Sequence, residues 1–485
     1  FLYVARLIHI LTIGVALCCI QPLTASKAWP LPMDSIDVNS DTITYGASVR
    51  AVAASGDYAP FWFHSNRYGA VSVQPYSSQL SLSVSKELTR PRRWYDYSFG
   101  IEAIGQVDTK VSSLFFQQLY AHLRLCVIDI TVGIKPETWG NQDEFLSSGG
   151  FLFSQNARPM PRITIGIDHY VPVPFTYGYL ELKGGITHGW FTDNVYLKNS
   201  FLHHKFIGLR AGGTLPVTVN YEFHHAAQWG GVSPVYGELG SSFKDLVTVF
   251  FAGSGGTMSN DQINAYGNHL GSQSLGLDVK VGAWTVSTYW QNIFEDGPIK
   301  PLWEAMNLSD GVWGISIKQS QFPYISGLLY EFVNTTDQSG PFHDKDGLVF
   351  GGNDSYFTNS VYANGWNYFN RTLGTPFITS PIYNTDGSLA TLNNRSSAHH
   401  LGIKGDIFGF RYRTLVSHAK NYGRYGDGDA LKSTNTAILL EVKKQIPELW
   451  DLDISLSLGA DIGTQFGNSY GVMFSIAKRG IIWIY

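Results

Sequence analysis

The chain has 485 residues, of which 15% are charged, well under the roughly 25% of an ordinary soluble domain. Its apolar fraction of 44% is ordinary, which excludes a helical membrane protein because such a chain is much more apolar. The net charge of −4, without any long basic run, excludes a nucleic-acid partner.

The N-terminus has the pattern of a secretory signal peptide over residues 1–28. An arginine precedes an apolar run from Leu7 to Ile20, and small residues follow it, with cleavage expected after Ala25 or Ala28. The apolar run is too short for a comfortable membrane-spanning helix. An N-terminal anchor helix is the alternative interpretation.

Beyond the signal peptide, residues 29–42 are interpreted as a periplasmic segment and 43–485 as an all-β transmembrane antiparallel barrel. No further apolar run reaches about 18 residues, and a membrane-spanning chain without such runs must be a barrel. Apolar and polar residues alternate in many segments, for example over 452–459. A soluble sandwich gives the same alternation, so the period alone leaves both folds open.

The order of strands and links favours the barrel. Eighteen strands are expected, at 43–54, 77–88, 94–106, 113–125, 127–135, 162–169, 176–190, 203–211, 215–225, 271–281, 283–293, 312–320, 324–334, 398–405, 407–418, 432–444, 451–462 and 470–484. Very short links fall on one side with both termini, at Cys126, Gly282, Gln321–Pro323 and Gly405–Asp406. Long links fall on the other side, at 55–76, 136–161, 226–270, 294–311 and 335–397. Short periplasmic turns, long outer loops and an even strand number are typical of a bacterial outer-membrane barrel.

Three segments add detail. The helical spacing of apolar residues over 240–253 predicts a short helix inside a long loop. The composition of 335–397 predicts an ordered surface loop packed down by its aromatic side chains. The last strand carries aromatic residues at Trp483 and Tyr485, a chain end of the kind that the barrel assembly machinery reads.

Several stretches resemble the Wzi-type capsule assembly proteins. They are EFLSSGGFLFSQNARPMPRI (144–163), LHHKFIGLRAGG (202–213), YEFHHAAQWGG (221–231), DQINAYGNHLGS (261–272) and YWQNIFEDG (289–297). The resemblance runs from about Tyr45 to the C-terminus. It implies an eighteen-stranded outer-membrane barrel with a lectin-like role, which is to hold capsular or exopolysaccharide at the cell surface after export. It also implies a small periplasmic helical element, for which the sequence shows no strong pattern.

Polysaccharide binding needs aromatic faces for sugar rings and polar side chains for hydroxyl and acidic groups. Three sets on the outer loops meet this need and are the candidate binding residues. They are Asn364, Trp366, Asn367, Tyr368 and Arg371; Trp139, Asn141, Gln142, Asn156 and Arg158; and Trp303 with Asp310. The alternative for each set is packing between loops, or an aromatic girdle at the membrane interface.

Catalytic and metal-binding patterns are weak. Adjacent histidines, as at 203–204, 224–225 and 399–400, point to opposite faces of a strand, so such a pair cannot hold one ion. Ser417 and His418 form a nominal nucleophile and base, more consistent with a strand end. The sequence therefore predicts no enzyme activity, no metal and no cofactor.

The expected partners are surface polysaccharide, outer-membrane lipid and, during biogenesis, the barrel assembly machinery. The leading alternative is a porin for oligosaccharides or anionic solutes, since Arg411, Arg413, Glu441 and Lys443 are expected to line the lumen. Loops that fold over the mouth would favour polysaccharide binding, whereas loops that stand aside would favour the porin.

Overall fold

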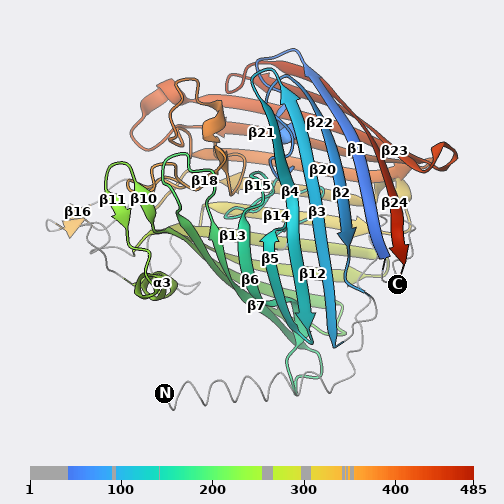
Figure 1. Cartoon of the computed structure of the whole chain (residues 1–485), viewed down its shortest axis with the longest axis horizontal. Coiled ribbons are helices and arrows are strands. Elements are labelled where there is room, and N and C mark those ends of the chain that lie inside the picture. The colour runs from blue at the N-terminus through green and yellow to red at the C-terminus, as the bar shows by residue number, and fades with distance from the viewer. Residues whose placement is uncertain are drawn as a thin grey trace.

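The computed structural model describes residues 42–89, 94–140, 142–253, 266–295, 307–340, 344–345, 348–349 and 354–484. The predicted signal peptide at 1–28 and the periplasmic segment up to residue 41 lie outside these residues. Eighteen strands each pair antiparallel with the next along the chain, and the last pairs with the first, so the sheet closes into a barrel (Figure 1). The predicted fold class is confirmed.

The barrel strands are β1 (Thr42–Ala54), β2 (Tyr76–Lys86), β3 (Tyr95–Asp108), β4 (Ser112–Leu125), β5 (Ile128–Ile134), β6 (Pro161–Pro172), β7 (Leu180–Trp190), β8 (Phe201–Ala211), β9 (Val217–Trp229), β12 (Asn268–Val281), β13 (Trp284–Glu295), β14 (Gly311–Gln319), β15 (Gly327–Asn334), β20 (Ser396–Ile407), β21 (Phe410–Asn421), β22 (Ser433–Ile446), β23 (Leu452–Gly463) and β24 (Ser469–Ile484). The loops carry β10 (Gly231–Ser233), β11 (Gly237–Leu239), β16 (Asp344–Lys345), β17 (Leu348–Val349), β18 (Asn367–Tyr368), β19 (Arg371–Thr372), α2 (Phe61–His64) and α3 (Phe243–Phe250). Short 3-10 helices are η2 (Pro323–Ile325), η3 (Pro381–Tyr383), η4 (Gly428–Leu431) and η5 (Pro447–Leu449). None of the helices in the described ranges is long and apolar enough to cross a membrane.

Each predicted strand corresponds to one observed strand, with ends that differ by four residues at most. The turn predicted at Gly405–Asp406 is wrong, because both residues belong to β20. The chain turns instead at Phe408 and Gly409, which have φ angles of 55° and 78°. Two consecutive residues with positive φ are what a tight two-residue hairpin needs.

The links are sorted between the two ends of the barrel. The short links after β4, β12, β14 and β20 lie at the end that holds both termini of the barrel, and the long links lie at the other. Two further short links, 109–111 and 464–468, lie at the long-loop end. By comparison with bacterial barrels, the long-loop end is the outer end and the short-turn end is the periplasmic end.

Side chains alternate across the wall. In β2, Leu80 and Leu82 are exposed on the outside, whereas Gln79 and Ser81 are buried. The same alternation in other strands leaves an apolar belt around the barrel. Such a belt, on eighteen closed strands with short turns at one end, identifies an outer-membrane barrel.

The helix predicted within 240–253 is confirmed as α3. Ser242 caps its start, since its hydroxyl accepts a hydrogen bond from Asp245 N at 3.3 Å while the Asp245 carboxylate accepts one from Ser242 N at 2.8 Å. Figure 1 shows α3 beside the barrel at its outer end.

The prediction of an ordered surface loop over 335–397 is wrong in the surface position of residues 354–395. Trp366, Phe377 and Ile378 are buried in one cluster with Phe61 of the first long loop. Burial of these large side chains inside the barrel removes more apolar area from water than a surface position would.

Candidate functional site

Three outer loops fold into the barrel. Their segments 55–75, 142–160 and 354–395 form one buried apolar cluster with residues of the wall such as Leu329 and Leu439. We refer to these three segments as the plug. Its largest buried side chains include Phe63, Phe151, Phe357, Trp366 and Tyr368. The plug packs apolar side chains of three loops against the inner face of the barrel wall.

Polar contacts fix the first plug segment to the wall. The backbone N–H of Phe61 donates to Asp461 Oδ2 in β23 at 2.8 Å. The guanidinium of Arg67 pairs with Glu441 in β22 at 2.6 Å, and Arg413 of β21 pairs with the same carboxylate at 3.0 Å. Three neighbouring strands therefore hold this segment.

The second plug segment reaches deep into the barrel. Asp143 lies 2.9 Å from Lys318 Nζ and 3.3 Å from Lys404 Nζ, near the periplasmic ends of β14 and β20. Burial alone would raise the pKa of Asp143, but the two ammonium groups hold that pKa at about 2. The segment is thus tied to the wall by a carboxylate that is ionised at neutral pH.

The first predicted set lies inside the plug. Trp366 is fully buried, and its indole N–H donates to Leu152 O at 2.8 Å. Arg371 donates to Val71 O at 2.7 Å and to His64 O at 3.3 Å, so it joins the first and third plug segments. These contacts hold loops together.

The remaining members of that set, Asn364, Asn367 and Tyr368, are also buried. Asn367 Nδ2 donates to Asn364 O at 2.5 Å, and the Tyr368 hydroxyl shares a 2.6 Å hydrogen bond with Thr192 Oγ1. Sugar contact through this set stays a prediction, and it would require the plug to open.

The residues of the second predicted set lie in different surroundings. Trp139 is half-buried, with its ring 4.9 Å from His204 and 5.0 Å from Phe206, and Gln142 donates to its carbonyl oxygen. Asn141 lies outside the described residues. The binding role of these residues stays a prediction.

Asn156 connects the first two sets, which the sequence presents as separate. It is buried and donates to Thr372 Oγ1 at 2.9 Å. Nearby, the rings of Phe153 and Trp366 lie 5.6 Å apart. Asn156 of the second set therefore packs against the loop that carries the first set.

The third set is placed only in part, because Trp303 lies outside the described residues, and its binding role stays a prediction. Asp310 is fully buried and accepts hydrogen bonds from Gln338 N at 2.8 Å, Asp337 N at 3.0 Å and the Tyr356 hydroxyl at 2.9 Å. In this structure Asp310 ties the start of β14 to the loop after β15.

One part of the predicted sets is open to solvent. The guanidinium carbon of Arg158 lies 3.7 Å from the ring centre of Phe115 and 4.8 Å from that of Phe369. Phe369 is 38% exposed, and its backbone N–H donates to Asp193 Oδ2 at 2.9 Å. Burial and the nearby Arg371 lower the pKa of Arg158 to about 10, so it remains charged at neutral pH. We refer to Arg158, Phe115 and Phe369 as the outer patch.

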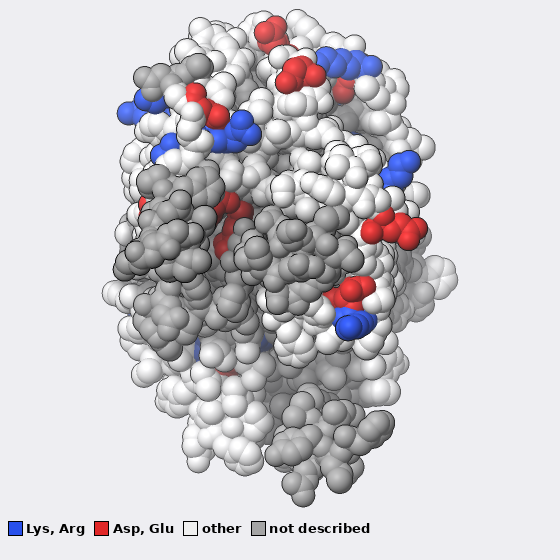
Figure 2. All heavy atoms as spheres, turned by 90° about the vertical axis from the view of Figure 1, so that its left-hand side faces the viewer, with Lys and Arg blue, Asp and Glu red and all other residues white. Residues whose placement is uncertain are grey.

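The outer patch lies near the outer rim, because Phe115 stands close to the outer end of β4. Phe369 is one of the aromatic residues of 335–397 that the sequence analysis expects to pack that loop, and it is not among the candidate binding residues. Only its position at the turn between β18 and β19, with a φ of 48°, leaves the ring exposed. Figure 2 shows acidic and basic side chains interspersed on the outer end, with most of the described surface uncharged.

The charged residues predicted to line the lumen on β21 and β22 are paired across the wall, and each carboxylate is shared by two cations. Arg413 pairs with Glu441 at 3.0 Å, while Arg411 and Lys443 each lie 3.6 Å from Asp453 in β23. These contacts agree with structural pairing, the alternative to an electrostatic filter.

The side chains of Ser417 and His418 point to opposite faces of β21. His418 shares a hydrogen bond with Thr436 at 2.9 Å, on the face opposite to Ser417. Ser417 instead shares a 2.7 Å hydrogen bond with His400 and accepts one from Trp62 Nε1 at 3.1 Å. Ser417 and His400 are both buried, and their contacts hold the plug.

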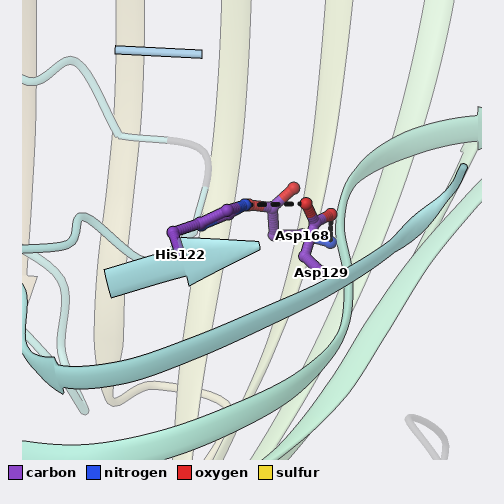
Figure 3. Close-up of side chains that lie close together, drawn as sticks. All are labelled: His122, Asp129 and Asp168. Carbon is purple, nitrogen blue, oxygen red and sulfur yellow. Dashed lines mark hydrogen bonds and ion pairs between the residues drawn. The ribbon is translucent and has the colours of Figure 1, made fainter. Parts of the chain in front are cut away.

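A second network joins β4, β5 and β6 (Figure 3). Possible metal-ligand atoms of His122, Asp129 and Asp168 lie within 4.8 Å of one another. Arg124 already binds both carboxylates, Asp129 at 2.6 Å and Asp168 at 2.9 Å, and His122 lies 2.9 Å from Asp129. A metal ion would have to displace the guanidinium, so the residues fit an ion-pair network better than a metal site.

No family model and no curated protein matches the chain. Among solved structures, it is similar to Wzi of Escherichia coli, described as a carbohydrate-binding β-barrel of the outer membrane involved in group 1 capsule assembly. The TM-score is 0.57 at 13% identity, over 91% of this chain and 84% of that one. A likeness to OccK5 of Pseudomonas aeruginosa has a TM-score of 0.47 at 9% identity, over 92% and 99% of the two chains. The predicted resemblance to the Wzi-type barrel is confirmed at the level of the fold.

Proposed function

We propose that this outer-membrane barrel holds capsular or exopolysaccharide at the cell surface, without chemistry. The observation that carries the proposal is the plug. Apolar side chains from three outer loops are packed together within the barrel, where a diffusion porin needs a wetted path. The likeness to Wzi agrees with this proposal but extends only to the fold.

The outer patch is the proposed contact surface. The exposed ring of Phe369 offers a face on which a sugar ring can stack, and Arg158 offers donors for hydroxyl or acidic groups. A patch of this size binds weakly on its own. Many barrels that hold one polymer would retain it through avidity.

The test uses purified, refolded protein in two parallel measurements. One is retention of the protein on immobilised anionic polysaccharide from the source strain, and the other is conductance in a planar bilayer. Saturable retention without steady conductance is the expected result. Large, steady conductance without retention would overturn the proposal in favour of a porin.

A further inference from the structure

Helix α3 packs against the outside of the barrel wall. His204 faces the interior, where its ring lies 4.9 Å from Trp139, so the preceding residue His203 faces outward. The ring of Phe250, at the end of α3, lies 5.2 Å from the ring of His203. Val249 is buried in a cluster with Trp229 of β9. The helix therefore packs against the outward face of β8 and β9 at their outer ends.

The apolar surface of the helix extends beyond the face that packs on the wall. Leu246, Val249 and Phe250 pack toward the wall. Beside them, a stripe recurs at every fourth residue, namely Phe243, Val247 and Phe251, which are 78%, 41% and 73% exposed. A surface helix in water keeps one apolar face for its core and presents polar residues elsewhere. The exposed part of this apolar surface therefore favours an apolar medium.

The position of α3 places this surface next to the lipid-facing belt of the barrel. Lys205, on the outward face of β8, donates a hydrogen bond to Phe250 O at the C-terminal end of the helix, where a cation is favourable. Further along the same face of β8, Ile207 and Leu209 are exposed as part of the apolar belt. The exposed stripe of α3 is continuous with the surface that meets lipid.

We propose that α3 lies in the outer leaflet of the membrane and inserts Phe243, Val247 and Phe251 at the boundary between headgroups and acyl chains. The same loop packs Leu239 against Val361 and Tyr362 of the plug. Insertion of α3 in the membrane would therefore hold in place the loop between β9 and β12, which also packs on the plug. This inference is independent of what the outer patch binds.

The test places an environment-sensitive fluorescent amino acid at position 243 or 251 of the full chain, in phosphatidylcholine vesicles with brominated acyl chains. Position 209 on the lipid-facing wall is the positive control, and position 386, on an exposed plug loop, is the aqueous control. We expect bromine quenching at 243 and 251 within about twofold of that at 209, and at least fivefold above that at 386. Aqueous iodide should give the reverse order. Signals at 243 and 251 that match those at 386 would overturn the proposal. Each label replaces an exposed side chain, and heat-modifiable migration on gels checks that each barrel has folded.

Discussion

Glu331, in β15, accepts a 2.7 Å hydrogen bond from the hydroxyl of Ser147 in the plug. The same buried carboxylate accepts a 2.7 Å hydrogen bond from the backbone N–H of Ser148. We expect Glu331→Ala to leave these donors, and the Tyr289 hydroxyl that also donates to the carboxylate, without this partner, at a cost of about 1–3 kcal/mol. The second plug segment should loosen, and planar-bilayer recordings should show openings that the wild type lacks.

Glu238→Ala is the matched control, because Glu238 is exposed on β11. This control should behave as the wild type. If the Glu331→Ala barrel shows no more openings than the wild type, the plug does not depend on this contact.

The ion pairs of Asp143 predict acid-sensitive anchoring. Its folded pKa of about 2 lies below the reference value of 3.8, so the pairing stabilises the plug fully above pH 3.8 and is lost as the pH falls through 2. The shift corresponds to about 2 kcal/mol, since one pKa unit is worth about 1.4 kcal/mol. Pepsin cleavage of segment 142–160 should therefore accelerate between pH 4 and pH 2, after correction for the enzyme's own pH dependence. In Asp143→Asn the cleavage rate should not accelerate between pH 4 and pH 2. The same acceleration in that variant would show that Asp143 is not the group responsible.

Alternation and turn residues were enough to predict the wall of the barrel. Each strand has one face in lipid and one toward the interior, so its period of two is directly visible in the sequence. The turn at Phe408 was missed because a phenylalanine with positive φ carries no local signal. The three-residue shift at this turn affects no other strand, since neighbouring strands fix the register independently.

The interior of the barrel could not be predicted in the same way. Trp366 and Arg371 have the composition of a sugar site, but their contacts come from Leu152, His64 and Val71, which are hundreds of residues away in the chain. The residue types show that these side chains need binding partners. They do not show whether the partners are sugars or other loops of the chain. The same limit explains why Phe369 was assigned to packing.

Trp366→Ala tests the structural role of this residue. Removal of a fully buried tryptophan should cost about 3–5 kcal/mol and loosen the plug. The expected result is faster proteolysis of segment 354–395 and openings in bilayer recordings. Proteolysis at the wild-type rate, together with lost polysaccharide retention, would instead favour direct sugar contact.

Phe369→Ala tests the outer patch at a partly exposed side chain of the plug. Stacking on an aromatic ring contributes about 0.5–1.5 kcal/mol, so retention of the polysaccharide should fall about twofold to tenfold per contact, and further under multivalent conditions. The control is Tyr177→Ala, because Tyr177 is an exposed aromatic residue on a periplasmic turn, at the opposite end of the barrel from the outer patch. Equal retention by the two variants would remove Phe369 from the site.

The charge of Arg158 gives a sharper prediction about the ligand. If the guanidinium binds acidic groups of the polymer, Arg158→Gln should weaken retention of an anionic polysaccharide at least fivefold and leave retention of its carboxyl-reduced, neutral form nearly unchanged. Arg158→Lys should recover part of the binding, since it keeps the charge but loses the planar group that stacks on Phe115 and Phe369. The variants are compared at low and high salt, because an ionic contact near the surface weakens as salt rises. An equal loss for the anionic and neutral polymers would show instead that Arg158 serves only to hold the two rings in place.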